Sequence, residues 1–434
     1  MDSYALTTDG RPVSHVERDL RRYLPGLDVR LQRFSATQAI VPSHLLRALR
    51  IDYRDAASLL RSFGVERLDQ VSDADVVALL RTRDVRNLER RAAPAIALQR
   101  GVDWHLALCN VDRAWPLIGG PDAIDWTGVS VGQIDTGYTR HPAYGFPQAP
   151  WVKTTLARTF WPPPPAESPT EPPPELGAGL DNLSGLNGGH GTKTGCTIAG
   201  RAPDGSFYGV APKVPLVPVR ICNTVVINDR QAQFDMAVRH LVDVAKVNVI
   251  NVSLGLFPST PTKQFKHAID YAYDNGVIVV CAAGNHVRSV VAPASMRRTL
   301  AIGGITREDV PWSGSSHGPE VDLSAPAADV RRAVTAPPGD KFSYSAGGDG
   351  TSYATAIVSG AAALWLVRHR ASLSQAYTQR WQVVEAFKKA VMSSTRQPAN
   401  WQPGSFGTGV LDAKALLEFP LPAAGTLTAD ASNA

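Results

Sequence analysis

Four polar residues of this chain have the types and the order that nucleophilic catalysis by serine requires. Asp135, His190, Asn285 and Ser352 each lie within two residues of a glycine, in the segments QIDTG, GGHGT, AAGN and GTS. A serine hydroxyl becomes a nucleophile when an imidazole accepts its proton and a carboxylate holds that imidazole in one tautomer. Donors such as a side-chain amide must also face the charge that develops on the attacked oxygen. Together the four residues favour an acyl-transfer site.

Each of these residues, taken alone, also has a purely structural explanation. Asp135 in Asp-Thr-Gly can stabilise a turn through its own backbone. A serine such as Ser352 at the start of a helix commonly caps it, and Asn285 after a glycine tolerates a left-handed turn. Only the combination and the order of the four residues point to chemistry.

The segments that must position these residues alternate between strand-like and helical patterns from about residue 126 onward. Nearly continuous apolar runs predict strands buried on both faces of a parallel sheet, and apolar residues at spacings of three and four predict helices between them. Sites in open α/β sheets form outside the carboxyl ends of the strands, where Asp135 and Asn285 are expected. The predicted strands are 128–135, 214–221, 247–255, 276–285 and 299–306, and the predicted helices are 231–246 and 260–275.

These segments resemble, in the same order, those of the subtilisin-like serine proteases, the subtilases of peptidase family S8. The resemblance spans about residues 103–417. It implies an α/β, subtilisin-like three-layer fold with a mostly parallel central sheet, and a peptidase domain over residues 103–419. The segments that carry it are VGQIDTGYTRHP, GGHGTKTGCTIAG, VNVINVSLG, VIVVCAAGN, SSHGPEVDLSAP and GTSYATAIVSGAAAL.

The resemblance also implies a role for each matching residue. Ser352 would be the nucleophile, His190 the general base and later the general acid, and Asp135 the group that orients His190. The Asn285 side chain and the Ser352 backbone N–H would form the oxyanion hole. The implied activity is endopeptidase cleavage of a protein or peptide through an acyl-enzyme intermediate.

Two further segments are expected to contact the substrate. Ser253, Leu254 and Gly255 would pair with the extended substrate backbone as an added strand. Ala282, Ala283 and Gly284 would form one wall of the pocket for the residue before the cut bond. Because these walls are small, we expect room for a sizeable apolar or aromatic side chain.

Two departures from the family pattern, in residues 353–356 and at Lys193, leave a second hypothesis open. The family's Met-Ala-x-Pro after the serine is replaced by residues 353–356, Tyr-Ala-Thr-Ala, and its second histidine by Lys193. Lys193 either lies near His190 and lowers the pKa of the imidazole or extends into solvent. A proline-rich insertion at 161–189 is expected to be an extended, mobile loop. The alternative hypothesis is a catalytically inactive protein of the same fold that only binds peptides.

The first 102 residues are expected to form a separate, mainly helical region, with helical spacing in 43–68 and 72–80. This region is interpreted either as a prosegment that is removed or as a module that recognises a protein partner or substrate. Residues 1–100 hold 17 Arg and 13 acidic residues, a mixture that favours a solvated surface over a nucleic-acid patch. The tail, 420–434, is expected to be disordered.

The composition of the chain indicates which general class of protein it belongs to. The chain has 434 residues, 44% hydrophobic and 19% charged, with a net charge of +5, which suits a globular protein. No apolar run reaches the roughly 18 residues of a membrane span, no secretory signal is visible, and the four cysteines lack metal-type spacing. We therefore expect a cytoplasmic protein without membrane partners, with export by another route left open. The chemistry needs no cofactor; structural calcium is compatible with the family resemblance, without assignable ligands.

Overall fold

The computed structural model divides the chain into two compact units, Met1–Ile96 and Ala97–Ala434. This division lies close to the expected boundary between residues 102 and 103. The structure describes residues 103–160, 178–337 and 339–433 with their side chains, and the backbone of four strands at 3–8, 32–33, 38–41 and 65–71.

The described part of the first unit is a four-stranded sheet rather than a set of helices. Its antiparallel strands lie in the order β2-β3-β1-β4. The prediction of helix is wrong for residues 65–68, which belong to β4, because pairing with β1 overrides their local pattern; the other residues with predicted helical spacing lie outside the described ones. The strands are β1 (Ser3–Thr8), β2 (Gln32–Arg33), β3 (Gln38–Val41) and β4 (Val65–Val71).

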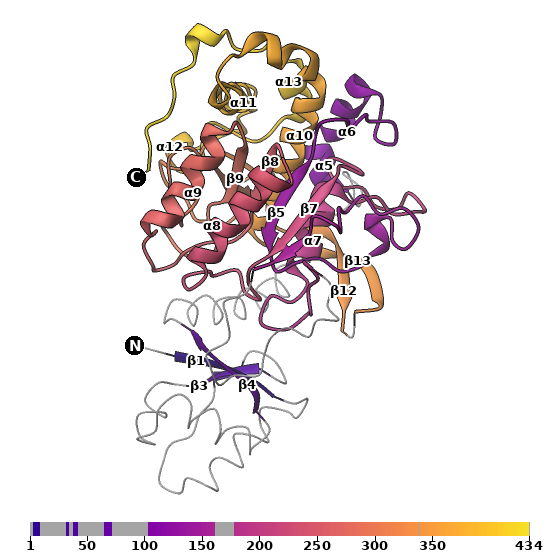
Figure 1. Ribbon diagram of the computed structural model, residues 1–434, viewed down its shortest axis with the longest axis vertical. Helices are drawn as coiled ribbons and strands as arrows, with labels where there is room; N and C mark the ends of the chain where they lie inside the picture. The colour runs from indigo at the N-terminus through magenta and orange to yellow at the C-terminus, as the bar shows by residue number, and fades with distance from the viewer. Residues whose placement is uncertain are drawn as a thin grey trace, which may run out of the picture. The chain divides into compact units, whose positions relative to one another are not determined.

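The second unit is built on a seven-stranded sheet in which every neighbouring pair is parallel (Figure 1). Each of the five strands predicted from the sequence is present, in shorter form. The order across the sheet is β11 (Leu323–Pro326), β10 (Leu300–Ile305), β9 (Ile278–Ala282), β8 (Val249–Val252), β5 (Val131–Asp135), β7 (Leu216–Arg220) and β6 (Arg158–Thr159).

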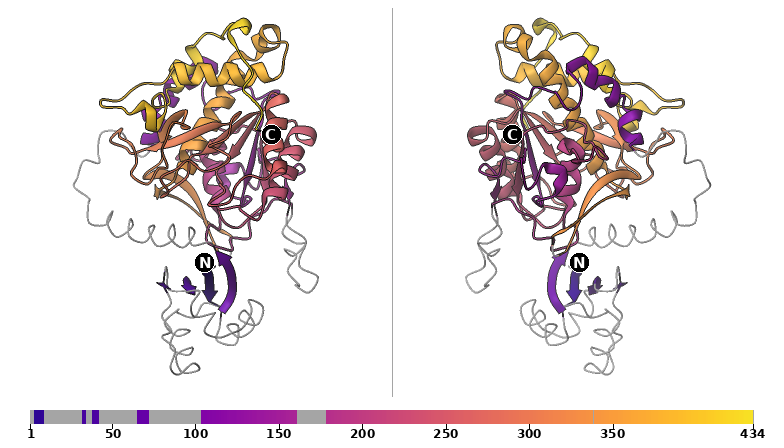
Figure 2. Two further views of the ribbon diagram at one scale, coloured as in Figure 1. Left: turned by 90° about the vertical axis from the view of Figure 1, so that its left-hand side faces the viewer. Right: turned by 90° about the vertical axis from the view of Figure 1, so that its right-hand side faces the viewer.

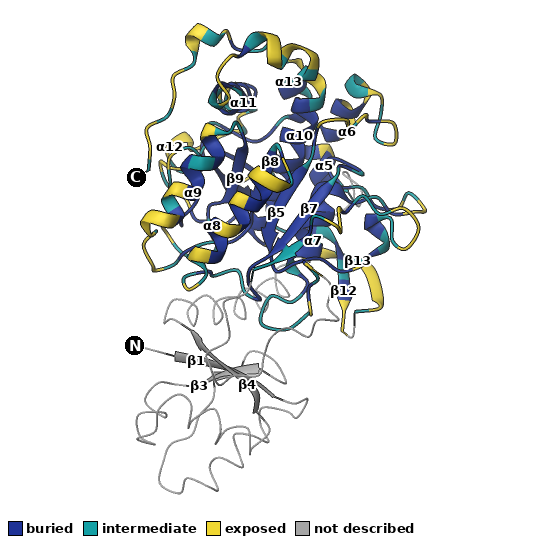
Figure 3. Cartoon of the chain, viewed as in Figure 1, coloured by how far each residue is buried: buried dark blue, intermediate teal, exposed yellow. Residues whose placement is uncertain are grey.

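Helices cover both faces of this sheet, which gives the expected three layers. Helices α8 (Gln231–Arg239), continued by the π-helical turn His240–Val244, and α9 (Lys263–Asp274) pack on one face. Helices α7 (His190–Ala199) and α10 (Thr351–Ala376) pack on the other (Figure 2). The strands are buried on both sides (Figure 3), except for the half-buried edge strand β6; this burial explains the continuous apolar sequences of the others.

Smaller elements surround these layers. An antiparallel hairpin, β12 (Val330–Ala336) and β13 (Lys341–Gly348), leads directly into the segment before α10. None of the helices in the described ranges is both long and apolar enough to cross a membrane. The remaining elements are α5 (Trp104–Leu108), α6 (Val111–Ala114), η1 (Trp115–Ile118), η2 (Pro142–Tyr144), α11 (Trp381–Ser393), α12 (Pro403–Phe406), α13 (Ala413–Glu418) and η4 (Ala424–Thr426).

The C-terminal segment is bound to the domain surface, so the prediction of disorder is wrong for residues 420–433. Tyr377 donates its hydroxyl to the carbonyl of Pro422 at 2.8 Å. The Asn433 side chain donates to the carboxylate of Asp270 at 2.9 Å. These polar contacts order a segment whose composition alone carries no signal of structure. All four cysteines of the chain are buried free thiols.

Candidate active site

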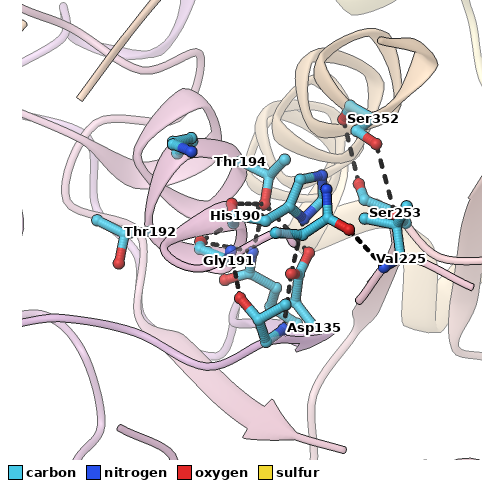
Figure 4. A network of polar contacts seen from close by, with 12 residues as sticks. Asp135, His190, Gly191, Thr192, Thr194, Val225, Ser253 and Ser352 are labelled. Atoms are coloured by element: carbon cyan, nitrogen blue, oxygen red, sulfur yellow. Dashed lines mark hydrogen bonds and ion pairs between the residues drawn. The ribbon is translucent and has the colours of Figure 1, made fainter. Parts of the chain in front are cut away.

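Asp135 and His190 meet at the carboxyl end of β5. Asp135 is the last residue of β5 and His190 the first of α7. His190 Nδ1 lies 2.8 Å from Asp135 Oδ1, which also accepts the backbone N–H of Thr136 at 2.7 Å. The hydroxyl of Thr194 lies 3.2 Å from Asp135 Oδ2 (Figure 4). The carboxylate, 1% exposed, thus has hydrogen-bond partners on both oxygens.

The close approach of α7 to β5 depends on a glycine. A Cβ at Gly191 would lie 2.1 Å from the carbonyl oxygen of Gly137, so no larger residue fits there without movement. The Gly191 N–H donates to the Thr136 hydroxyl at 3.0 Å. The glycine after His190 thus lets the helix start rest directly on the turn after Asp135.

Ser352 lies at the second position of α10, buried beside the segment that follows β8. Its hydroxyl donates to the carbonyl of Ser253 at 3.4 Å, and the Ser253 hydroxyl donates to the carbonyl of Ser352 at 3.1 Å. Figure 4 shows this pair with Asp135 and His190 in one view. The predicted nucleophile is therefore held by one long hydrogen bond of its own side chain.

Asn285 caps the helix that carries Ser352. Its Oδ1 accepts the backbone N–H of Thr351 at 2.8 Å and the Thr351 hydroxyl at 2.9 Å. Because Oδ1 accepts these two hydrogen bonds, the amide nitrogen Nδ2 points away from Thr351. It lies 3.4 Å from the position that a Cβ on Gly350 would take. The cap that the sequence pattern suggested for Ser352 is supplied by Asn285, so the serine hydroxyl takes no part in capping the helix.

The predicted substrate-pairing segment is partly engaged by the protein itself. Gly255 donates its N–H to the carbonyl of Val225 at 2.9 Å and accepts from the N–H of Ile227 at 3.0 Å. Leu254 is buried, with 2% of its surface exposed. A substrate strand would therefore compete with Val225 for the N–H of Gly255, whereas the carbonyl of Gly255 can accept a second hydrogen bond. The sequence offered no signal for this contact.

Ala282, Ala283 and Gly284, the predicted pocket wall, follow the end of β9 toward Asn285. Ala282 and Ala283 are buried, and the carbonyl of Ala283 accepts the N–H of Val291 at 2.9 Å. The segment that contains Val291 thus packs behind this wall. Its position affects how large a side chain the pocket can hold.

The departures from the family pattern are accommodated in the structure. Tyr353 packs into an apolar cluster with Trp104 and Val330, and burial raises the pKa of its hydroxyl to about 12. Ala356 lies inside the unbroken helix α10. Lys193 Nζ donates to the carbonyl of Gly188 at 3.4 Å. None of these residues interrupts the elements that carry Asp135, His190 and Ser352.

Asp181 is a site residue that the sequence did not reveal. Its Oδ2 accepts the Thr136 hydroxyl at 2.6 Å and the N–H of Gly189 at 2.8 Å, so it joins the residues that flank Asp135 and His190. Burial raises the pKa of Asp181, against the effect of these hydrogen bonds. Residues 178–189 are therefore ordered beside the site, contrary to the expected mobile loop; 161–177 lie outside the described residues.

Gln133 and Thr194 form a second support that went unpredicted. Gln133 Nε2 donates to the Thr194 hydroxyl at 2.8 Å and to the carbonyl of Gly191 at 2.9 Å. A signal was present here, because Gln133 is a polar residue in an apolar strand, two positions before Asp135 and on the same face. Over the ranges with described side chains, no group of three or more His, Cys, Asp and Glu residues is placed to hold a metal ion, so we assign no calcium ligands.

Comparison with known proteins agrees with this geometry. The family model described as "Subtilase family" matches residues 127–409. Subtilisin E of Bacillus subtilis strain 168 is 33% identical over 187 residues, which cover 42% of this chain and 46% of that protein. Mycosin-1 of Mycobacterium tuberculosis is 28% identical over 346 residues, which cover 68% of this chain and 70% of that protein. The chain thus matches about half the length of the first relative and more of the second.

A solved structure supports the same fold. The crystal structure of MycP1 with the N-terminal propeptide removed superposes with a TM-score of 0.54 at 24% sequence identity. The superposition covers 74% of this chain and 98% of that one. At this level of identity the similarity shows the fold alone. The chemistry has to be argued from the residues of the candidate site.

Proposed function

Because the chain belongs to the subtilase family, we propose that it is a serine endopeptidase that uses Ser352, His190 and Asp135. The observation that carries this proposal is the 2.8 Å contact between His190 Nδ1 and Asp135 Oδ1. A proton on Nδ1 that is donated to this carboxylate leaves the lone pair of Nε2 available as a base. Ser352 lies at the same edge of the sheet, on the helix start capped by Asn285.

In the acylation step, His190 Nε2 takes the proton of Ser352 Oγ while Oγ attacks the carbonyl carbon of the scissile peptide bond. This requires the hydroxyl to turn from the Ser253 carbonyl, where its hydrogen bond is 3.4 Å long, toward the imidazole. Catalytic hydrogen bonds are often long without substrate and tighten in the complex. Asp135 stabilises the imidazolium that forms.

The carbonyl oxygen of the substrate becomes an oxyanion in this step. Asn285 Nδ2 and the backbone N–H of Ser352 are the donors we assign to it, and the positive end of α10 adds to their field. The C–N bond then breaks as imidazolium returns the proton to the leaving amine. Water, deprotonated by His190, hydrolyses the acyl-enzyme by the reverse sequence and releases the carboxylic acid. These steps use no cofactor.

A fluorophosphonate probe tests the proposal directly, since it phosphonylates an activated serine. We expect the full chain to be labelled and the Ser352→Ala variant to remain unlabelled. Ser359→Ala is a matched control, because Ser359 is a buried serine of the same helix whose hydroxyl donates to Asn251; it should label like the wild type. Absence of label on the folded wild type, or equal label on Ser352→Ala, would overturn the proposal.

A further inference from the structure

The side chain of Val291 fills the space between the segments that follow β8 and β9. A Cβ built on Gly255 would lie 2.6 Å from Val291 Cγ2, and one built on Gly284 would lie 3.1 Å from Val291 Cγ1. Both distances are shorter than ordinary contact between carbon atoms. The isopropyl group of Val291 therefore lies against both segments, with too little space beside either glycine for an added Cβ.

This space is next to the point where a substrate would be attacked. Ser352 Oγ lies 3.4 Å from the carbonyl oxygen of Ser253, at the start of the first segment. Asn285, at the end of the second, is bonded to Thr351 beside the same serine. A carbonyl carbon bound to Oγ with its oxygen toward Asn285 places the acyl-side residue of the substrate between the two segments. Its side chain then points toward Val291.

Val291 is not free to move aside. Its N–H donates to the carbonyl of Ala283 at 2.9 Å, and its carbonyl accepts from Ser295 at 3.0 Å. The adjacent carbonyl of Ala292 accepts from Leu256 at 2.8 Å, which ties the same stretch to the first segment. A β-branched valine also has few χ1 rotamers. The methyl groups therefore form a rigid floor.

On the premise of the proposed function, we infer that Val291 restricts this protease to substrates with a small residue, Gly, Ala or Ser, on the acyl side of the cut bond. The small residues of the two segments had led us to expect room for a large apolar or aromatic side chain. That expectation considered only the residues of the two walls and left out Val291, which lies between them. A larger side chain could enter only by displacing packed methyl groups, which close-packed interiors resist.

Peptides that differ only at the acyl-side residue, Ala against Phe, test this inference on the full chain. We expect the wild type to have a kcat/KM for Ala about 100-fold above that for Phe, in line with the discrimination that packed apolar pockets reach. Val291→Ala should reduce this ratio at least about tenfold by accelerating the Phe peptide. Val290→Ala removes the same atoms from a neighbour that is equally buried, and should leave the ratio unchanged.

The outcomes separate this inference from the proposed function. If the folded wild type binds the fluorophosphonate but cleaves Phe as fast as Ala, the inference alone is wrong. It is also wrong if Val291→Ala and Val290→Ala, both shown by circular dichroism to be folded, have the same ratio. If the wild type neither labels nor cleaves any peptide, the proposed function fails and this inference fails with it.

Discussion

The two sides of the candidate active site are held in different ways. On the side of Asp135 and His190, the carboxylate has partners on both oxygens and is supported by residues from β5, α7 and the 178–189 segment. On the side of Ser352, the hydroxyl has one hydrogen bond of 3.4 Å. The position of the Ser352 backbone is set by the start of α10 and by the Asn285 cap.

This difference follows the demands of the proposed chemistry. The imidazole must keep one tautomer and one orientation through both steps, so rigid support is useful there. The serine oxygen changes from a hydroxyl group to the ester oxygen of the acyl-enzyme, and its side chain must rotate to do so. A weakly hydrogen-bonded side chain on a fixed backbone allows that rotation. We therefore expect kcat to be sensitive to changes in remote polar groups on the carboxylate side. On the serine side, it should depend mainly on the few direct contacts.

The largest effect is expected for Asp135→Asn. The amide presents an N–H toward His190 and favours the tautomer that lacks a lone pair on Nε2. A loss in kcat of about 10⁴ is known for this change in another serine protease, and we expect the same order here, measured with a peptide that the wild type cleaves. Asp309→Asn is the control, since the carboxylate of Asp309 pairs with Arg396 and not with a residue of the candidate site. Activity within tenfold of the wild type would contradict the role of Asp135.

The serine side is tested by Asn285→Ala. Removal of one oxyanion donor typically costs about 10²–10³ in kcat, a range taken from subtilisin. The variant also loses the cap of α10, so its unfolding must be measured by thermal denaturation alongside the kinetics. Asn285→Asp separates the two effects, because it keeps the Oδ1 acceptor for Thr351 but has no amide N–H. If Asn285→Asp retained full kcat, Asn285 would be a structural cap only.

A smaller effect is expected for Asp181→Asn. The amide replaces one acceptor oxygen with a donor. Its NH₂ group then faces either the Thr136 hydroxyl and the Gly189 N–H, which both donate to Oδ2, or the Leu183 N–H, which donates to Oδ1. We expect kcat to fall about tenfold with KM changed little, since misplacement of supporting groups weakens catalysis more than binding. Asn182→Ala, at the exposed neighbour, should match the wild type. Equal kcat in both variants would show that Asp181 supports the loop alone.

Much of the sheet domain was predictable because its signals are local and repeated. Strands β5, β7, β8, β9 and β10 were visible as apolar runs, and helices α8 and α9 as periodic patterns between them. Placement of Asp135 and Asn285 at one edge followed from parallel strand direction. The pairing of His190 with Asp135 across 55 residues was implied only by the family resemblance, since spacing alone does not bring two distant residues together.

What could not be predicted depends on contacts that leave no local pattern. Asp181 lies in a glycine-rich stretch that resembles any solvated loop, and its role exists only because the 178–189 segment folds back onto Thr136. The terminal residues 420–433 look disordered by composition and are ordered by hydrogen bonds to distant side chains. In the first unit, β4 forms because β1 pairs with it. Val291 lies several residues beyond the predicted wall and reaches it only through the fold.

The smallest effect is expected at Thr194, the outermost support of the carboxylate side. Gln133 already donates to the Thr194 oxygen, so the hydroxyl proton must go to another acceptor. Asp135 Oδ2 at 3.2 Å and the carbonyl of His190 at 3.0 Å are the nearest. Thr194→Val keeps the shape and removes this proton, leaving the buried Gln133 amide opposite a methyl group. We expect a loss in kcat of about three- to tenfold, equivalent to one hydrogen bond of modest net strength.

The matched variant Thr194→Ser restores the hydroxyl without the methyl group. If the hydroxyl supports Asp135, Thr194→Ser should recover most of the kcat, and the KM of both variants should stay near that of the wild type. If the residue only fills space, Thr194→Val should instead be the better of the two, because it preserves the packing. The order of these two variants therefore decides whether the dense polar support behind Asp135 contributes to catalysis or only to the stability of α7 against β5.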